Sequence, residues 1–161
     1  MIDDHIETEN TEKHLVYQLG SELFATPLIE VREVVEYRQA KPIPHTAPFF
    51  KGVINIRGEI IGVLDLRERM NVPNGAEPVA QLVFETDHGP LAATVDRVLS
   101  VSIIPDEAID RRTSVQAETS ERPYFIGVGK ADGQIMTVVS LRKILTPEEL
   151  VKAMPSGTRP R

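Results

Sequence analysis

The segment "PFFKGVINIRGEIIGVLDLRERM" (48–70) decides the fold, because it predicts two strands joined by one tight turn. Residues 51–57 and 59–66 are mostly apolar, and Gly58 separates them. Glycine adopts turn conformations without steric cost, so the pattern predicts a β-hairpin over these residues. Arg57 places a charge at the turn of this apolar hairpin. It is either a solvated turn residue or a side chain that the turn exists to present.

A second segment, "YFIGVGKADGQIMTVVSLRKIL" (124–145), repeats the first hairpin at a constant shift of 75 residues. Residues upstream of the two hairpins match as well, at a slightly shorter shift. The matched positions include Phe24-Ala25 with Leu91-Ala92, Val31 with Val98, Gly52 with Gly127, Gly58 with Gly133 and Arg67 with Arg142. Each half therefore predicts the same small β unit. Many short strands with glycine turns favour two small barrels over one open sheet, and closing a sheet removes its unpaired edges.

The rest of the chain is also mostly β in pattern. Strands are predicted over 14–19, 22–28, 30–37, 79–86 and 91–104, the last as one bent strand or two. Val31, Val34 and Tyr37 recur at a spacing of three, which also allows a helix. The β-branched content around them favours a strand. Three prolines make 40–48 a loop, and polar residues make 105–121 another.

Only the C-terminus predicts a well-defined helix. Thr146 is a good N-cap, Pro147 suits the first helical position, and Glu149 completes a capping box. Leu150, Val151 and Met154 then recur on one face at spacings of three and four.

Composition argues against several classes of function. The chain of 161 residues has a net charge of −6 and no tryptophan, which argues against a nucleic-acid surface. It has no cysteine, so neither a disulfide framework nor thiolate chemistry is expected, which fits a reducing cytoplasm. No apolar run approaches the roughly 18 residues of a membrane span, and the acidic N-terminus does not resemble a signal peptide. We therefore expect a cytoplasmic protein that does not insert into a membrane.

No pattern for catalysis or for a metal stands out. The histidines are too far apart in sequence to form a metal-binding pair, and each is expected to be exposed: His5, His14, His45 and His88. There is neither a dinucleotide-binding glycine motif nor a phosphate-binding loop. The carboxylates Glu30, Glu33 and Glu36 are expected on solvated faces. The sequence therefore predicts a binding module rather than an enzyme, with no catalytic residue, metal or cofactor.

The central segment "PHTAPFFKGVINIRGEIIGVLDLRERM" (44–70) resembles the signature of the CheW family of chemotaxis coupling proteins. That signature reads K-G-V-x-N-x-R-G after a phenylalanine that ends a proline-containing loop, followed by a strand that ends in D-L-R. The matching residues here are Phe50, Lys51, Gly52, Val53, Asn55, Arg57, Gly58, Asp65, Leu66 and Arg67. "YQLGSELFATPLIEVREVVEY" (17–37), "ATVDRV" (93–98) and the second hairpin also resemble family segments. The match covers about residues 14–151, nearly the whole chain.

The resemblance implies a mainly β, CheW-like fold. This fold has two five-stranded SH3-like β-barrel subdomains packed together, a hydrophobic groove between them and a short C-terminal helix. We expect one such domain over 13–154, whose intertwined subdomains take about 13–72 plus the C-terminal helix region, and about 78–141. Residues 1–12 are expected to form a disordered acidic tail, and 155–161 a flexible basic tail.

The resemblance also implies a function. CheW-like proteins have no catalysis of their own and connect the cytoplasmic hairpin tip of a chemoreceptor to the regulatory domain of a CheA-type histidine kinase. We therefore expect a cytoplasmic adaptor associated with membrane-bound receptor arrays. One alternative is a scaffold or decoy, in a pilus or other signalling system, that does not activate the kinase. A small-ligand-binding barrel is a third.

Five residues match family positions that are linked to receptor binding: Arg57, Glu33, Val31, Gly58 and Gly52. The resemblance implies that Arg57 contacts the receptor and pairs with Glu33. Such an exposed pair contributes only about 0–1 kcal/mol to stability, but it orients the guanidinium. Without the family context, each has a structural explanation: the two glycines meet backbone requirements, Val31 is a core residue and Arg57 is a solvated turn cation. With it, Arg57 and Glu33 are assigned to binding, the glycines to the backbone, and Val31 fits both roles equally.

Three further motif residues are expected to be structural. Asn55 is expected to brace the turn through side chain–backbone hydrogen bonds. Asp65 and Arg67 are expected to serve the fold, because the second half keeps its arginine. The chain departs from the family at Gly62, where many members have proline, and at Glu59, where an apolar residue is common. Both departures lie in the half that the family uses to meet the kinase.

Overall fold

The hairpin predicted over 51–66 is present, with β4 (Phe50–Ile56) and β5 (Glu59–Asp65) paired antiparallel. Its two-residue turn has a positive φ at both central residues, 50° at Arg57 and 88° at Gly58. This is the geometry of a type I′ turn, whose twist matches that of the strands it joins. Glycine adopts it freely, whereas few other residues do. The turn thus holds a charged side chain in a conformation that most residues avoid.

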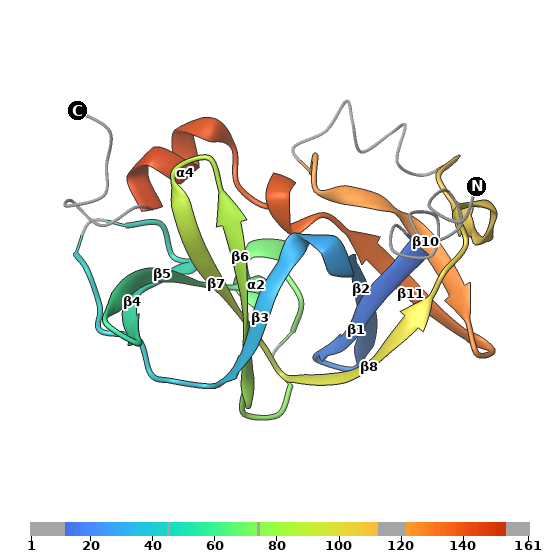
Figure 1. The fold of residues 1–161 in the computed structure, drawn as a ribbon, viewed down its shortest axis with the longest axis horizontal. Helices are drawn as coiled ribbons and strands as arrows, with labels where there is room; N and C mark the ends of the chain where they lie inside the picture. The colour runs from blue at the N-terminus through green and yellow to red at the C-terminus, as the bar shows by residue number, and fades with distance from the viewer. Residues whose placement is uncertain (1–11, 45, 74, 113–121, 154–161) are drawn as a thin grey trace.

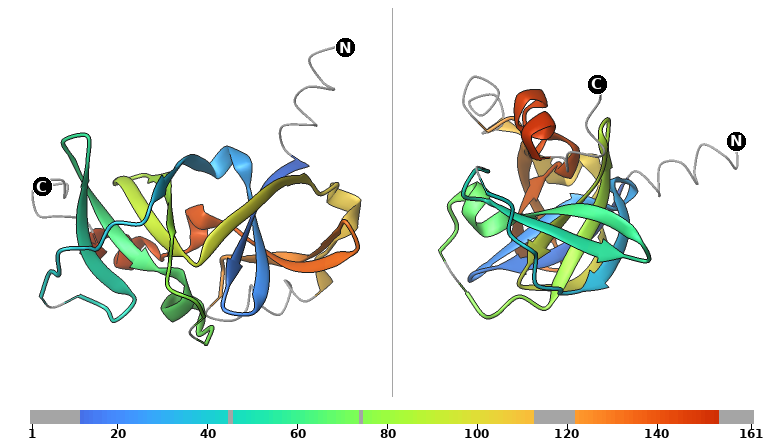
Figure 2. Two further views of the ribbon diagram at one scale, coloured as in Figure 1. Left: turned by 90° about the horizontal axis from the view of Figure 1, so that it is seen from below. Right: turned by 90° about the vertical axis from the view of Figure 1, so that its left-hand side faces the viewer.

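The structure, a computed structural model, describes residues 12–44, 46–73, 75–112 and 122–153 and contains two sheets (Figure 1). The six-stranded sheet has the order β8 (Arg97–Ile103), β1 (Lys13–Leu19), β2 (Glu22–Pro27), β11 (Gln134–Val139), β10 (Phe125–Ala131) and β9 (Ile109–Asp110). The five-stranded sheet has the order β3 (Val31–Glu36), β6 (Ala80–Thr86), β7 (Gly89–Val95), β5 and β4. The sheets lie side by side along the long axis, with hairpins β4–β5 and β10–β11 at opposite ends (Figures 1 and 2). The predicted mainly β fold with two subdomains is confirmed, with six strands in one sheet where five were predicted.

The two halves of the chain exchange strands between the sheets. In each sheet, the first hairpin of one half pairs in parallel with the last hairpin of the other half: β2 with β11, and β7 with β5. Ala25, for example, lies opposite Val138. Each sheet therefore contains strands from both 13–72 and 78–141, the approximate bounds expected for the two intertwined subdomains. A repeat identifies equivalent strands, but tertiary packing decides which copies pair.

Two very short connections join the sheets. One is a three-residue 3-10 turn, η1 (Leu28–Glu30), between β2 and β3, and the other is the single residue Asp96 between β7 and β8. The stretch 91–104 is therefore two strands rather than one. The stretch 30–37 contains the strand β3, so the helical alternative there is wrong.

Some predicted features lie wholly or partly outside the described residues. These are the acidic tail (1–12) except Glu12, the basic tail (155–161), and the histidines at 5 and 45. The polar loop predicted over 105–121 is described up to residue 112, where it contains η2 (Asp106–Ala108) and β9.

A short helical segment follows each repeated hairpin. α2 (Leu66–Met70) follows β5, while η3 (Leu141–Lys143) and then α4 (Pro147–Ala153) follow β11. The predicted capping box is confirmed, because Glu149 N donates to Thr146 Oγ1 at 3.1 Å and Thr146 N donates to Glu149 Oε1 at 2.9 Å. Within the described ranges, every helix is too short or too polar to cross a membrane.

Three hydrophobic clusters form the core, one within each sheet and one shared between them. The shared cluster takes Leu15 and Tyr17 from one sheet and Leu82 and Leu91 from the other. Strand β1 is consequently buried on both faces, and burial raises the pKa of the Tyr17 hydroxyl above its ordinary value. Repeat partners occupy equivalent places in the two sheet clusters: Val16 and Val83, Ala25 and Ala92, and Val138 and Val63.

The prediction that every histidine is exposed is wrong for His14, which is buried in β1, and His88 is half-buried. The His14 Nδ1 atom lies 2.6 Å from the carbonyl oxygen of Glu12. Burial lowers the pKa of His14 below its ordinary value of 6.5, against the opposing effect of the Glu12 hydrogen bond. A polar residue suits this place in both halves, since Gln81 occupies the equivalent position in β6 and is also buried.

We expect acid to destabilise the protein through His14. Because its folded pKa lies below 6.5, the unfolded chain binds more protons between the two pKa values. The contribution of His14 is therefore complete above about pH 6.5 and is lost as the pH falls through the folded pKa. His14→Gln introduces the residue that the second half has at position 81. In denaturant titrations, the free energy of unfolding of this variant should decrease less between about pH 8 and about pH 5 than that of the wild type. A slope equal to that of the wild type would contradict this account.

Candidate functional site

Arg57 and Glu33, the two residues expected to pair, are brought together in the structure. Arg57 Nη2 donates to both carboxylate oxygens of Glu33, at 2.7 Å each. The guanidinium comes from the β4–β5 turn and the carboxylate from β3, so the pair joins the hairpin tip to an edge strand of the same sheet. The Arg57 side chain is 66% exposed. The pair therefore orients the guanidinium while leaving most of it accessible to a partner.

The edges of the five-stranded sheet, β3 and β4, are also joined by contacts of the backbone. Lys41, a few residues beyond β3, pairs with Val53 of β4: Lys41 N donates to Val53 O at 2.8 Å, and Val53 N donates to Lys41 O at 3.0 Å. Nearer the turn, Arg38 Nη1 donates to the Asn55 carbonyl oxygen. Contacts of this kind bring the two edges of one sheet together, as closure into a barrel requires.

Glu59, where the chain departs from the family pattern, belongs to a charged cluster beside the Arg57 pair. Arg32 Nη2 lies 3.2 Å from Glu59 Oε1, and Arg32 Nη1 lies 3.0 Å from Glu85 Oε1. These hydrogen bonds, first the one with Glu59, raise the pKa of Arg32 above its ordinary value. Solvent screens charges in such exposed positions, so the cluster orients side chains more than it stabilises the fold.

Three motif residues in and near the turn have separate local roles. Asn55 Oδ1 accepts a hydrogen bond from Gly58 N at 2.8 Å and so braces the turn. A methyl group at Gly58 would meet nothing within 4 Å, so only the backbone φ favours glycine there. Gly52 has a φ of 129°, and a Cβ atom there would lie 1.9 Å from the carbonyl oxygen of Lys41. Glycine at position 52 is required by the close approach of two backbone segments.

Arg67 makes a buried ionic contact with Asp96, a residue to which the sequence analysis gave no role. Arg67 Nη1 lies 3.2 Å from Asp96 Oδ1 and donates to the Ala76 carbonyl oxygen at 3.1 Å. Asp65 Oδ1 accepts from Arg67 N at 2.9 Å and caps α2. Asp96 Oδ2 accepts from Gly20 N at 2.9 Å. Asp96 stands in the family-like segment "ATVDRV", but nothing in the spacing indicates that it meets Arg67.

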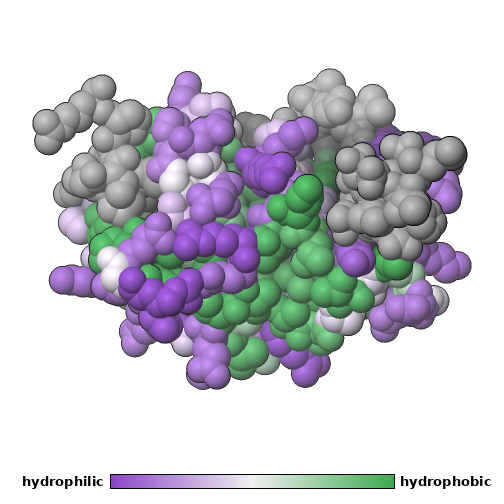
Figure 3. All heavy atoms as spheres, in the orientation of Figure 1, coloured by the Kyte–Doolittle hydropathy of each residue, from purple (hydrophilic) through white to green (hydrophobic). Residues whose placement is uncertain are grey.

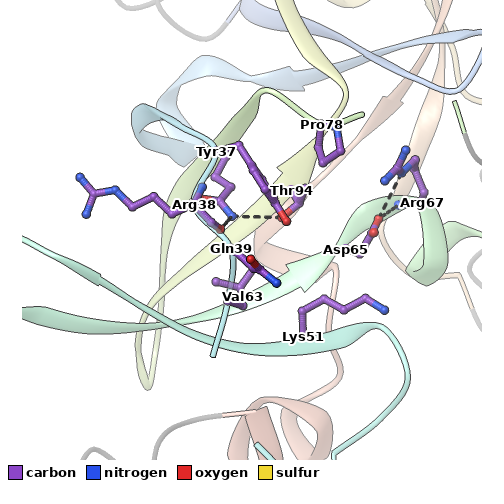
Figure 4. A pocket seen from close by; sticks show the side chains of 11 residues that line it. Tyr37, Arg38, Gln39, Lys51, Val63, Asp65, Arg67, Pro78 and Thr94 are labelled. Atoms are coloured by element: carbon purple, nitrogen blue, oxygen red, sulfur yellow. Dashed lines mark hydrogen bonds and ion pairs between the residues drawn. The ribbon is translucent and has the colours of Figure 1, made fainter. Parts of the chain in front are cut away.

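Asp65 and Arg67 also line a cavity of about 310 Å³ in the five-stranded sheet (Figure 4). Deeper in this cavity, Gln81 Nε2 donates to the Arg38 carbonyl oxygen at 2.9 Å and to Thr94 Oγ1 at 3.3 Å. The Arg38 side chain points away from the cavity in Figure 4. Several polar groups here are thus engaged with one another, but the buried Arg67 Nε makes no hydrogen bond and lies 3.6 Å from Asp65 Oδ1. Across the described part of the chain, no three His, Asp or Glu side chains gather closely enough to hold a metal.

Apolar side chains gather on the side of the molecule that carries β3, η1 and β8 (Figure 3). Between 44% and 63% of each of five of them is exposed: Ile29, Val34, Leu99, Val101 and Ile103. Val31 and Val98 are partly buried and pack against the cluster shared by the two sheets. We call these seven residues the apolar face. A contiguous exposed set of this kind marks an interaction site, whereas single exposed apolar residues do not.

Both copies of the repeat contribute equivalent residues to the apolar face. Val31 and Val34 on β3 match Val98 and Val101 on β8, each at a shift of 67 residues (Val31 to Val98). Both strands are edges of their sheets, and each has a pairing irregularity at the same place, just after the first of its two valines. The sequence analysis assigned only Val31 to the site. The match of Val31 with Val98 in the repeat is the sequence signal that indicates the part of the apolar face on β8.

Comparison with known proteins gives consistent results. The family model of the CheW-like domain matches residues 13–149. The chain is 28% identical over 141 residues to the chemotaxis protein CheW of Klebsiella aerogenes, covering 86% of this chain and 84% of that protein. It is 26% identical over 151 residues to the chemotaxis protein CheW of Rhizobium meliloti, covering 87% and 96%. The crystal structure of the scaffolding protein TtCheW from Thermoanaerobacter tengcongensis is similar with a TM-score of 0.75 and 26% identity, covering 86% of this chain and 90% of that one.

Proposed function

The chain belongs to the CheW-like family, and from this membership we propose that it is a non-enzymatic adaptor that couples chemoreceptors to a CheA-type histidine kinase in chemotaxis. The family match extends over most of the chain, and similar proteins carry the name chemotaxis protein CheW. The proposed partners are the cytoplasmic hairpin tip of a chemoreceptor and the regulatory domain of the kinase. The proposed location is the cytoplasmic side of a membrane-bound receptor array.

The apolar face is the observation that carries this proposal. Its centre is apolar, and the charged pair of Arg57 and Glu33 lies beside it, with Glu33 between Val31 and Val34 on β3. An apolar centre with a polar margin is the usual composition of a protein–protein interface. The tip of a receptor, as a pair of helices, can lay an apolar ridge against such a surface. We assign Arg57, Glu33 and Val31 to this contact, and Gly52 and Gly58 to the shape of the hairpin that supports it.

Arg57→Glu should weaken binding of a chemoreceptor cytoplasmic fragment by at least about tenfold, because it reverses a charge at the margin and sets it against Glu33. Arg57→Asn is the matched control for the turn, since asparagine tolerates a positive φ at this position. It should weaken binding less, because it removes the guanidinium without adding a like charge. Calorimetric titration of both variants with the same fragment measures the effect.

Thermal unfolding separates a binding role of Arg57 from a structural one. The pair is exposed, so its loss should change the free energy of unfolding by no more than about 1 kcal/mol. A large loss of stability in Arg57→Glu, or binding as tight as that of the wild type, would contradict the assignment of Arg57 to the receptor contact.

Kinase contact is the second half of the proposed function. Adding the protein to receptor and kinase should raise kinase activity above that of the two partners alone. A scaffold or decoy would bind the receptor fragment and leave kinase activity unchanged, so this one comparison distinguishes the two adaptor-like alternatives.

A further inference from the structure

Each of the two connections between the sheets leads directly into a strand of the apolar face. η1 leads into β3, and Asp96 leads into β8. The connections are equivalent in the repeat, because Ile29 of η1 matches Asp96 at the shift that relates Val31 to Val98. A carboxylate anchors each of them. Asp96 is held by Gly20 and Arg67, and Glu30 anchors η1.

Glu30 binds the segment that follows β11, at the far end of the chain. Ser140 Oγ lies 3.0 Å from both carboxylate oxygens of Glu30, and Arg142 N donates to Glu30 Oε1 at 3.1 Å. Glu30 is half-buried, and its carboxylate is bound to these partners as well as partly exposed to solvent. η1 has no buried residue and no side-chain cap. Apart from the paired strands β2 and β3 on either side, two contacts hold η1, the carboxylate of Glu30 and the partial packing of Leu28 against the shared cluster.

We propose that Glu30 is a positioning residue for the apolar face. By holding η1 against Ser140 and Arg142, it fixes where Ile29 and Val31 lie relative to β8. A partner then meets a preformed surface, and binding does not carry the entropy cost of ordering it. The partner named in the test rests on the proposed function, whereas the positioning role concerns only the geometry of this chain.

Titration with a chemoreceptor cytoplasmic fragment tests the role of Glu30 in binding. Glu30→Ala should weaken binding roughly 3- to 30-fold, the range found for coupling through packed networks. Glu30→Gln keeps an acceptor for Ser140 and Arg142 and should restore most of the affinity. Ser140→Ala should weaken binding less than Glu30→Ala, and adding it to Glu30→Ala should change little, because the two residues act through one contact. Glu36→Ala, at an exposed carboxylate on β3, is the control and should bind like the wild type.

Three results would overturn the positioning role. The first is wild-type affinity in Glu30→Ala. The second is an equal loss in Glu30→Ala and Glu30→Gln, which would indicate a direct charge contact with the fragment. The third is full additivity of Glu30→Ala and Ser140→Ala.

If the proposed function is wrong, the result differs from all three, because the wild type itself does not bind the fragment. In that case hydrogen exchange decides the positioning role without any partner. The backbone amide of Val31, which donates to the Leu28 carbonyl oxygen, should exchange faster in Glu30→Ala than in the wild type, and at the wild-type rate in Glu36→Ala. Equal exchange in all three proteins would overturn the proposal.

Discussion

Arg67→Ala should lower the free energy of unfolding by about 3–5 kcal/mol, the usual cost of leaving one member of a buried ion pair alone. Asp96 is only 3% exposed and would keep a buried charge, with Gly20 N donating to Oδ2 and with Oδ1 deprived of its ionic contact. The Ala76 carbonyl oxygen would also lose its donor. Denaturant titration followed by circular dichroism measures the change.

Arg32→Ala is the matched control for Arg67→Ala. Arg32 also contacts two carboxylates, but it does so at the surface, where solvent screens the attraction. Its removal should leave the free energy of unfolding nearly unchanged. Asp96→Asn combined with Arg67→Ala should cost less than the two single changes added together, because the residues are in contact. If Arg67→Ala and Arg32→Ala lowered the free energy of unfolding equally, burial of the Arg67 contact would not explain its contribution to stability.

Gly52→Ala should destabilise the protein by about 3 kcal/mol or more, because it combines backbone strain with overpacking. Position 52 has a φ of 129°, and the added Cβ would lie 1.9 Å from the carbonyl oxygen of Lys41. Relief of this clash requires the backbone pair between Lys41 and Val53 to open. The midpoint of thermal or denaturant unfolding measures the loss.

Gly58→Ala separates backbone strain from the clash. Position 58 also has a positive φ, but the space around its Cβ is open. The change should therefore cost only about 1–2 kcal/mol, the penalty of a left-handed conformation for an ordinary residue. A weak effect of Gly52→Ala, equal to that of Gly58→Ala, would show that the segment at Lys41 moves away easily.

The order of strands along the chain was predictable from local pattern, but their pairing was not. The hairpin around Gly58 and its repeat around Gly133 follow from glycine turns between apolar runs. The capping box at Thr146 follows from three residues in sequence. By contrast, the exchange of strands between the halves depends on packing across the shared cluster. The burial of His14 depends on the same packing, because it buries both faces of β1.

Only part of the candidate site was predictable. The pairing of Arg57 with Glu33 was expected from the family resemblance, and the structure brings the two residues together. The role of Val98 and Val101 was missed, since an apolar residue on a strand is more often core, and only the three-dimensional fold shows these side chains on an edge strand. Glu30 was missed because its partners lie more than a hundred residues away in sequence.

An adaptor must hold two partners at the same time, and co-assembly tests this most directly. The protein, a chemoreceptor cytoplasmic fragment and the regulatory domain of a CheA-type kinase can be mixed and separated by size-exclusion chromatography with light scattering. We expect one species that contains all three chains, from which Arg57→Glu removes the receptor fragment while the kinase domain stays bound. Binding of neither partner, or displacement of one partner by the other, would contradict the proposed function.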